Sequence, residues 1–509
     1  MYTLKLCIVL TLLALMARVG SRFLLAGPAV NPALAQWIGR LHFHWIAAVW
    51  ILYLLPIHPL SHLLAAGTLL ASSRQVRQFP LVTLVFLSLG IPMLERRITG
   101  FPGIDSLFFF GWPLAVSLVV FALTRGNAGR WRDFPASVRT LFVVLFLFLF
   151  LLSFRGTSFT DGMRAALNYG ALFFLTATVV CRSRAPDWIP SFIYALIAVG
   201  LLASFISVFE SLRNWLLFAD LMGTYGTTEN HGVALYKYRE GLLRSVGAQG
   251  NLQSGLILSS ALIALVLIRR QLSGTLVFLG LVGVLAAGLL FTLSRGPVLV
   301  GLGVVLLFEL FRSRASSIPQ LAVFFGLAYG VLVFSGVIDL LQGMFQLQGD
   351  FNFNYRVRLF DASVDVILNH FLLGTQHFIG ILAGQGLVQG EGIVDIVNTY
   401  LQIGLQFGGV ALGVYALLML LALRKAISRI STGQPAARGK SEDKVVGTVD
   451  VFWLALAACM VNVFVQSASV SLLGYSSLFA LILVLVLMPA LPLVRPPPPA
   501  SDGVAPPAA

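Results

Sequence analysis

The sequence predicts an all-α fold, a polytopic membrane bundle of about 12 to 15 transmembrane helices with a large outer loop that contains amphipathic helices. Three observations lead to this fold class. The chain is 58% hydrophobic and has a mean hydropathy of +0.91. Its apolar residues form a series of runs about as long as a membrane-spanning helix. From residue 73 onward, every second gap between these runs is rich in arginine.

Each apolar run predicts one helix, because a helix needs about 20 apolar residues to cross a bilayer. Strands of a membrane barrel would be shorter and would alternate polar with apolar residues. The first run also resembles a signal peptide, but Arg18 and Arg22 separate it from the small residues around Ala35, so we expect a retained span. The expected spans are residues 3–19, 41–55, 57–72, 79–95, 105–124, 137–154, 163–182, 188–209, 252–268, 275–293, 297–312, 317–339, 399–423, 450–471 and 474–494.

The arginine-rich gaps define the side that we expect to face the cytoplasm. Of the 34 lysines and arginines, 19 fall on that inner side, 11 on the outer side, and four before residue 41 are left unassigned. The positive-inside rule does not require arginines on the outer side, so we take eight of these arginines as candidates for a functional role. They are Arg155, Arg164, Arg213, Arg239, Arg244, Arg295, Arg356 and Arg358.

The net charge of +14 follows from this topology, because the excess of basic residues lies on the inner side. We therefore expect no nucleic-acid partner. Cys7, Cys181 and Cys459 lie far apart in separate apolar runs, which predicts neither a disulfide framework nor a metal site. The chain has no CxxC or HExxH motif, so we expect no bound metal.

Two outer segments are too long to be simple connections, which predicts that they are functional. They divide the chain into N-terminal transmembrane helices (1–209), a first long outer loop (210–251), central transmembrane helices with a Ser-Arg-Gly turn (252–339), a large outer loop (340–398), C-terminal transmembrane helices (399–495) with a flexible basic inner loop (424–449), and a disordered proline-rich tail (496–509).

The large outer loop contains an amphipathic helical pattern. We expect its apolar stripe to lie on the outer membrane surface or to pack over the mouth of the bundle, and Gly374 to end the helix. Five glycines between residues 380 and 392 predict a mobile lid. The stripe consists of Phe360, Val364, Ile367, Leu368 and Phe371.

Topology alone does not explain Arg295. It lies in a tight turn, Leu293-Ser294-Arg295-Gly296-Pro297, between two apolar runs at the outer face. Its side chain either reaches the phosphate of membrane lipid or binds a lipid-linked phosphate through its planar guanidinium. Arg244 precedes the span that begins at residue 252, next to the free N–H groups of a helix N-terminus. Together the two arginines predict a pyrophosphate clamp.

Several other outer residues are candidates for this site. Arg356 and Arg358 either add to the clamp or belong to a solvated helix face. Carboxylates and imidazoles are the candidates for a catalytic base. Glu391 and Asp395 are four residues apart, so one helical turn would bring their side chains together. The full set of outer candidates is Asp361, Asp365, Glu391, Asp395, His231, His370 and His377.

Residues from about 160 to 425 resemble the superfamily of O-antigen ligases and O-antigen polymerases. The resemblance rests on five short segments that occur in order around the large outer loop. They are Arg244 to Asn251, Leu293-Ser294-Arg295-Gly296, Arg356-Val357-Arg358-Leu359-Phe360, Asn369-His370-Phe371-Leu372-Leu373-Gly374 and Val397-Asn398-Thr399-Tyr400-Leu401.

The resemblance implies a multi-pass enzyme of the bacterial inner membrane whose active site faces the periplasm. Members transfer a glycan from undecaprenyl diphosphate to a sugar acceptor, and they use no metal, nucleotide or other cofactor. The implied partners are the lipid-linked glycan donor, the glycan acceptor and membrane lipid, with a chain-length regulator or a flippase beside them. By resemblance, the diphosphate site contains Arg244, Arg295, Arg356 and Arg358, and the substrate-binding candidates are Arg164, Asn398 and Tyr400.

One position departs from the family pattern. Ligases carry a histidine immediately before the asparagine of the last segment, where this chain has Val397, which cannot transfer a proton. Asp395 is our first candidate for the base, followed by Glu391 and His377. Alternatively, the reaction relies on stabilising the charge of the leaving diphosphate.

Three functions compete. A polymerase joins lipid-linked repeat units, a ligase moves the finished polymer to lipid A core or another acceptor, and a transporter or flippase performs no chemistry. A transporter would carry charged residues along a path inside its spans, whereas here they concentrate at outer ends and loops. Because the ligase histidine is missing, we expect a polymerase, with a ligase and then a transporter as alternatives.

Overall fold

A computed structural model describes residues 2–28, 30–55, 60–91, 112–124, 131, 134–155, 159–183, 188–219, 238–239, 242–313, 351–388, 394, 396, 398–432, 443–470 and 476–490. Within these ranges the chain is almost entirely helical, as the sequence predicts. The strands described are β1 (Tyr238–Arg239) and β2 (Leu242–Leu243), which pair antiparallel just before the segment that contains Arg244. The expected span 317–339 and the tail 496–509 lie outside the described residues.

Most helices coincide with the expected apolar runs. Four described helices are long and apolar enough to cross a membrane: α1 (Tyr2–Leu25), α7 (Ala136–Ser153), α9 (Trp188–Arg213) and α19 (Thr399–Thr432). The other helices are α2 (Pro32–Leu54), α3 (Leu60–Gly67), η1 (Thr68–Ser72), α4 (Ser73–Gln78), α5 (Pro80–Gly90), α6 (Trp112–Thr124), α8 (Phe159–Arg182), α12 (Asn251–Leu267), η3 (Arg269–Gln271), α13 (Thr275–Phe291), α14 (Arg295–Ser313), α17 (Phe351–Asn369), α18 (Phe378–Gly384), α20 (Asp443–Gln466), α21 (Ser476–Leu487) and η4 (Met488–Ala490).

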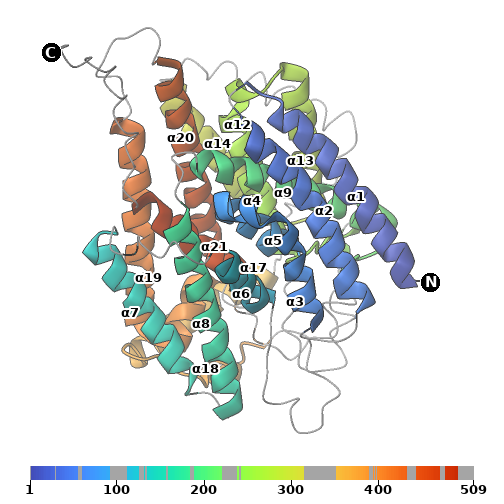
Figure 1. Cartoon of the computed structure of the whole chain (residues 1–509). Helices are drawn as coiled ribbons and strands as arrows, with labels where there is room; N and C mark the ends of the chain where they lie inside the picture. Colours follow the sequence, from blue (N-terminus) through green and yellow to red (C-terminus); the bar gives the residue numbers. More distant parts are fainter. Residues whose placement is uncertain are drawn as a thin grey trace, which may run out of the picture.

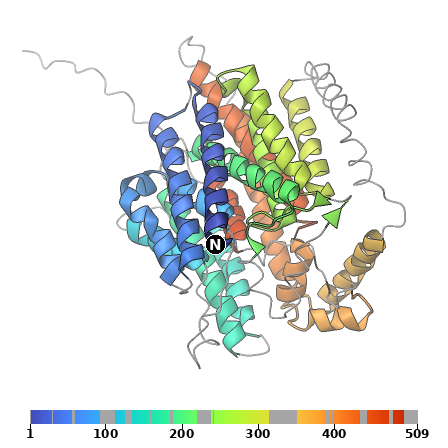
Figure 2. The ribbon, with the colours of Figure 1, turned by 90° about the vertical axis from the view of Figure 1, so that its right-hand side faces the viewer.

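Helix α9 is the most deeply buried of the long apolar helices, and α1, α5, α12 and α13 pack around it (Figures 1 and 2). Nearly every side chain in its apolar stretch is buried, because the residues are hydrophobic on all sides rather than on one stripe. The C-terminal helix α20 packs against the central helix α12, so segments about 200 residues apart in the sequence share one core.

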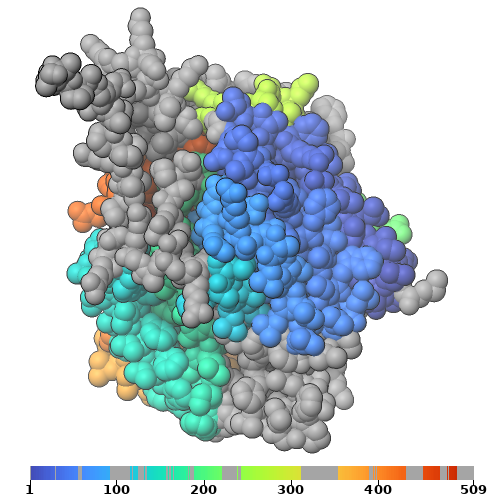
Figure 3. All heavy atoms as spheres, in the orientation of Figure 1, coloured from blue at the N-terminus to red at the C-terminus, as the bar shows by residue number. Residues whose placement is uncertain are grey.

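The outer surface of α1 is apolar along its length. Large hydrophobic side chains, each about half exposed, recur every three or four residues on that side, from Leu4 to Phe23. Helices α1 and α2 cover much of one face of the molecule, seen as blue spheres in Figure 3. A continuous exposed apolar stripe on a helix that is packed on its other side is typical of a lipid-facing surface. The stripe consists of Leu4, Ile8, Leu12, Met16, Val19 and Phe23.

Contacts between helix ends define two ends of the bundle. At the first, the Ser211 hydroxyl at the end of α9 donates to the carbonyl of Phe291 at the end of α13 (3.2 Å), and the amide of Thr399 at the start of α19 donates to the carbonyl of Ser467 after α20 (2.9 Å). We call this the arginine end, because Arg244 and Arg295 lie there. At the opposite end, Arg269 forms an ion pair with Glu309. The residues expected on the two sides of the membrane therefore gather at two different ends.

The N-terminal helices complete this arrangement. The indole of Trp215 donates to the hydroxyl of Tyr2 (2.9 Å), so α1 begins at the arginine end. Arg18 lies towards the other end, where its Nε donates to the carbonyl of Gly39 (3.1 Å). Helix α2 begins nine residues before the expected 41–55 span, because Asn31 caps it and Pro32 occupies its first position.

Two helices cover the first part of α19 and form a small second core. In this cap, α17 and α18 pack onto residues 399–407 (Figure 2). The expected amphipathic helix is present, but its buried stripe is a different one: Tyr355, Leu359, Val366 and Ile367 are buried, whereas Phe360, Leu368 and Phe371 are about half exposed or more. Of the two expected placements of the stripe, Ile367 follows the second, since it packs against Gly404 of α19.

Helix α19 breaks at Gly408, and the turn that follows α17 fits into the break. Gly408 has a φ of +93°, and the amide of Val410 donates to the carbonyl of Phe371 (3.3 Å). Arg155, just after α7, donates to the carbonyls of Leu373, Gly374 and Gln406 on both sides of the joint. Partial burial lowers the pKa of Arg155, although a guanidinium stays charged at any physiological pH. This arginine, which the sequence places on the outer side, therefore has a structural role.

Two expected flexible segments are partly helical. The expected basic inner loop begins at 424, but α19 continues to Thr432 and α20 begins at Asp443, because Arg424, Lys425 and Ala426 are good helix formers and Ala426 is buried. In the expected lid, α18 includes Gly380 and Gly384, since Phe378 and Leu382 are buried in the second core. Residues 389–393 lie outside the described residues.

Replacing Gly408 should destabilise the joint between α19 and the cap. A Cβ there would lie 2.7 Å from the Phe371 carbonyl oxygen, and an L side chain at positive φ is strained by about 1–3 kcal/mol. We expect Gly408→Ala to lower Tm in detergent. Gly413→Ala in the same helix is the control, because no atom lies within 4 Å of its Cβ position, and it should leave Tm unchanged or raise it slightly. Equal effects of the two substitutions would contradict this description.

Candidate functional site

The first two motif segments meet at the arginine end. Arg244 follows β2 and is half-buried, and its Nη2 lies 3.4 Å from the hydroxyl of Ser294, the residue before Arg295. The same hydroxyl lies 3.5 Å from the carbonyl oxygen of Asn251, the first residue of α12. The structure thus brings the Arg244 side chain next to the Ser-Arg-Gly turn, although about 50 residues separate them in the sequence.

The backbone after Arg244 is held by the carboxylate of Glu210, which is fully buried near the end of α9. Its Oε2 accepts hydrogen bonds from the Ser245 hydroxyl (2.7 Å) and from the amides of Val246 (3.0 Å) and Gly247 (2.8 Å). Its Oε1 accepts from the amide of Leu217 (2.9 Å). These four donors replace the water that the carboxyl group of Glu210 loses on burial.

Ser211, the next residue of α9, connects the same loop to α13. Its hydroxyl contacts the carbonyls of Leu243 and Phe291, and the amide of Ser245 donates to Phe291 as well (3.1 Å). The end of α13 and the loop that carries Arg244 are therefore fixed against each other by backbone groups. These contacts determine the position of Arg244 relative to α9 and α13.

The turn that carries Arg295 has an unusual backbone. Leu293 has a φ of +49°, a conformation that is rare for a branched side chain and costs about 1–3 kcal/mol. It is maintained because Leu293 is completely buried and its amide donates to the carbonyl of Leu290 (2.8 Å). Helix α14 begins directly at Arg295, which is half-buried. The turn thus presents Arg295 at a helix N-terminus, where the helix dipole also favours an anion.

The last motif segment joins this region through the turn after α20. Gly296 packs against Ser469, with 3.5 Å between its Cβ position and the Ser469 hydroxyl. In the same turn, the carbonyl of Ser467 accepts a hydrogen bond from the amide of Thr399. The Thr399 hydroxyl donates to the carbonyl of Val470 (2.5 Å). The segments around Arg244, Arg295 and Asn398 therefore form one contiguous structure at the arginine end.

Asn398 and Tyr400, two candidate substrate-binding residues, have structural contacts. The Asn398 side-chain oxygen accepts a hydrogen bond from the amide of Leu401 (3.1 Å) and so caps α19. The Tyr400 hydroxyl donates to the carbonyl of Phe464 (2.8 Å) and links α19 to α20. These contacts explain why an asparagine and a tyrosine suit these positions without any ligand.

The other candidate residues lie on the cap or outside the described residues. Arg356, Arg358, Asp361 and Asp365 are exposed on α17, and His370 is exposed in the turn after it. His377 is exposed at the start of α18, and Arg164 lies in α8. The proposed bases Glu391 and Asp395 lie outside the described residues, as do Val397 and His231. Within the described ranges, no group of three or more His, Cys, Asp or Glu side chains could hold a metal ion.

Two buried polar clusters were not expected from the sequence. Glu210 was taken as the first residue of an outer loop, although an acid at the end of an entirely apolar helix is a signal for buried donors. The second cluster lies between α12 and α20, where the amide of Asn462 donates to Ser259 (3.0 Å) and Ser260 (2.9 Å), and that of Gln466 donates to Ser259 (2.9 Å). Buried amides that bond to small hydroxyls are typical of contacts between membrane helices.

Comparison with known families gives no match, and a search of curated proteins gives none either. The candidate site therefore rests on the residue types and geometry at the arginine end.

Replacing the buried carboxylate should release the loop that carries Arg244. In Glu210→Gln, one carboxylate oxygen is replaced by an amide nitrogen, whose N–H groups face the donors that the oxygen accepted. Each buried donor left without an acceptor lowers the free energy of unfolding by about 1–3 kcal/mol. We expect a lower Tm and weaker binding of undecaprenyl diphosphate. Glu309→Gln, which alters the other buried carboxylate at the opposite end, should lower Tm without weakening this binding. Weaker binding in Glu309→Gln alone would refute the assignment.

Proposed function

We propose that this chain is a membrane glycosyltransferase that polymerises oligosaccharide repeat units carried on undecaprenyl diphosphate. In this proposal the helices form a polytopic bundle in the bacterial inner membrane, with the arginine end facing the periplasm. The observation that carries the proposal is the contact of Arg244 with Ser294, next to Arg295, on a loop held by Glu210. Two partly buried arginines from neighbouring segments suit an anion with more than one negative charge.

The chemistry requires stabilisation of the leaving group. A hydroxyl oxygen of the acceptor sugar attacks the anomeric carbon of the donor, and a new glycosidic bond forms. The bond between that carbon and the diphosphate oxygen breaks, and its electron pair leaves with undecaprenyl diphosphate. Arg244 and Arg295 offset the charge that develops on the diphosphate. The hydroxyl proton passes to a base, for which Asp395, Glu391 and His377 remain the candidates in that order.

The cap is suited to substrates that remain attached to lipid. Its inner face packs on α19, and on its outer side Phe360, Leu368 and Phe371 are exposed at the arginine end. Exposed apolar side chains next to a membrane surface can contact the polyprenyl chain or the surrounding lipid. A donor and an acceptor that are both carried on lipid could then approach from the membrane on either side of the cap.

Removing either arginine of the clamp should abolish polymerisation while leaving the fold intact. Arg244→Ala and Arg295→Ala should each lower turnover by about 100-fold or more, as loss of one transition-state donor does elsewhere. The lysine variants should recover little, because an ammonium cannot form bidentate contacts. Arg213→Ala removes an exposed arginine at the same end and should retain activity. Full activity in Arg244→Ala or Arg295→Ala would contradict the proposal.

The proposed activity can be tested with the purified chain and one substrate. With undecaprenyl-diphosphate repeat units alone, a polymerase should produce a ladder of longer lipid-linked glycans, resolved by gel electrophoresis after release from the lipid. If the chain does not lengthen the glycans but transfers them to lipid A core, it is a ligase that functions without the usual histidine. If it does neither, the assignment as an enzyme fails.

A further inference from the structure

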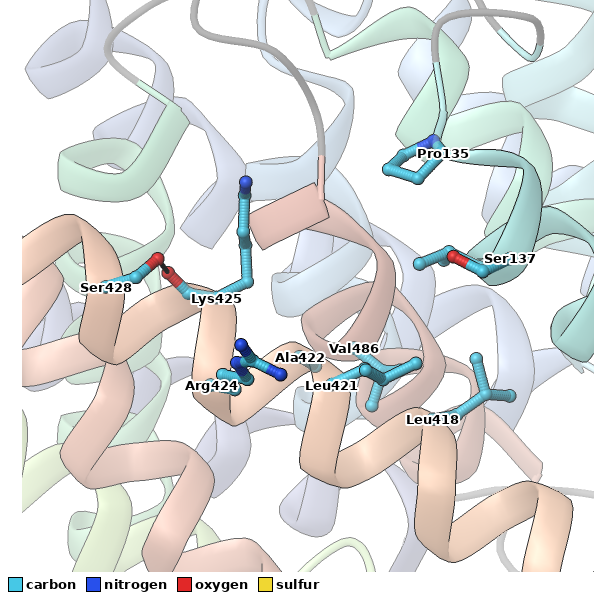
Figure 4. A pocket seen from close by; sticks show the side chains of 10 residues that line it. Pro135, Ser137, Leu418, Leu421, Ala422, Arg424, Lys425, Ser428 and Val486 are labelled. Atoms are coloured by element: carbon cyan, nitrogen blue, oxygen red, sulfur yellow. Dashed lines mark hydrogen bonds between the residues drawn. The ribbon is translucent and has the colours of Figure 1, made fainter.

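A groove at the opposite end of the bundle is separate from the candidate site. It lies between the start of α7, the end of the apolar part of α19, and α21, and has a volume of about 380 Å³ (Figure 4). Its floor is apolar and buried and includes Leu418, Ala422 and Val486. Its rim is polar, with Arg424, Lys425 and Ser428 from α19 and Ser137 from α7. The volume is within the range of small-ligand sites, about 300–1,000 Å³.

The described rim carries positive charge. Arg424 and Lys425 are adjacent and exposed, and none of the described residues that line the groove is acidic. In Figure 4 they lie across the groove from Pro135 and Ser137. The Ser428 hydroxyl donates to the Lys425 carbonyl (2.8 Å). An arginine and a lysine side by side at the end of an apolar helix suit a phosphate at the level of the lipid headgroups.

The start of α7 adds to the attraction for an anion. Pro135 precedes the helix, and the amide of Arg139 donates to the Pro135 carbonyl (3.1 Å) and closes the first turn. The N–H groups of the first turn therefore point out of the helix end, close to Ser137 and Val138 on the groove wall. The helix dipole adds positive potential on the side of the groove opposite the two basic residues.

Beyond the rim of the groove, towards the middle of the bundle, the surface of α19 and α7 is apolar and can contact lipid acyl chains. One helical turn or more from the rim, Leu417 and Leu420 on α19 and Val143 and Leu147 on α7 are exposed, at 40–62%. An occupant therefore meets cations and hydroxyls at one end and open apolar surface at the other. A soluble phosphate would use only the first of these.

We propose that this groove binds an anionic glycerophospholipid, with its headgroup phosphate between Arg424, Lys425 and the start of α7, and its acyl chains along the exposed side chains of α19 and α7. The site would connect α7 to α19, the helix whose other end carries the cap and the Asn398 segment. It does not depend on the proposed enzymatic function.

The test uses the full-length chain in nanodiscs of neutral phosphatidylcholine, to which phosphatidylglycerol is added while Tm is measured. Phosphatidylglycerol should raise Tm, with half-maximal effect at a low molar fraction. In the double variant Arg424→Ala/Lys425→Ala the required fraction should rise by roughly tenfold or more. The control Arg77→Ala/Arg270→Ala removes two exposed arginines outside the groove and should respond like the parent protein.

Three results would overturn the proposal. The first is a phosphatidylglycerol response that is unchanged in Arg424→Ala/Lys425→Ala. The second is an equal loss of response in the control variant, which would indicate a general attraction of the basic surface for anionic membranes. The third is an equal rise of Tm with inorganic phosphate in neutral nanodiscs, which would assign the groove to a soluble anion. The groove variant is first checked for the parent Tm in neutral lipid, which establishes that it folds.

Discussion

The buried carboxylate of Glu210 joins the central helix of the bundle to the loop that carries Arg244. Helix α9 has apolar residues on all sides, and an acid near its end needs partners that the helix itself cannot provide. The partners come from Leu217 and from the segment Ser245 to Gly247. Because the backbone N–H groups of that segment converge on one carboxylate, the loop has one position relative to α9. The Ser-Arg-Gly turn lies next to this loop, because the Arg244 side chain contacts the Ser294 hydroxyl and the amide of Ser245 donates to the carbonyl of Phe291.

A second joint, at Gly408, places the cap at the same end. Arg155 binds three carbonyls across this joint, whereas the Arg244 side chain is directed to the turn that carries Arg295. The outer arginines thus differ in role. Arg155 holds backbone segments together, Arg213 is exposed, and Arg244 and Arg295 are half-buried, with the Arg244 side chain next to Ser294, the residue before Arg295. This division supports a clamp at Arg244 and Arg295 better than the mere number of arginines does.

The sequence predicted the helices well because runs of apolar residues leave few alternatives, and the expected spans 188–209, 252–268 and 275–293 agree with α9, α12 and α13 to within a few residues. The sequence predicted the burial and the partners of side chains less well where contacts between distant segments determine them. The sequence left open whether the stripe containing Ile367 faces lipid or the bundle, because both sides of α17 carry apolar residues and only packing on α19 distinguishes them. Glu210 was missed because its donors lie up to 37 residues away in the sequence. The bases Asp395 and Glu391 remain predictions from sequence.

The central claim is that Arg244 and Arg295 bind one anion together. A double-mutant cycle on the binding of undecaprenyl diphosphate to the purified chain tests it most directly. If both guanidinium groups contact the same diphosphate, the double alanine variant should bind only slightly more weakly than either single variant, because the first substitution already removes most of the shared contact. Losses in binding free energy that simply add, or single variants that bind like the parent protein, would show that the two arginines do not form one site.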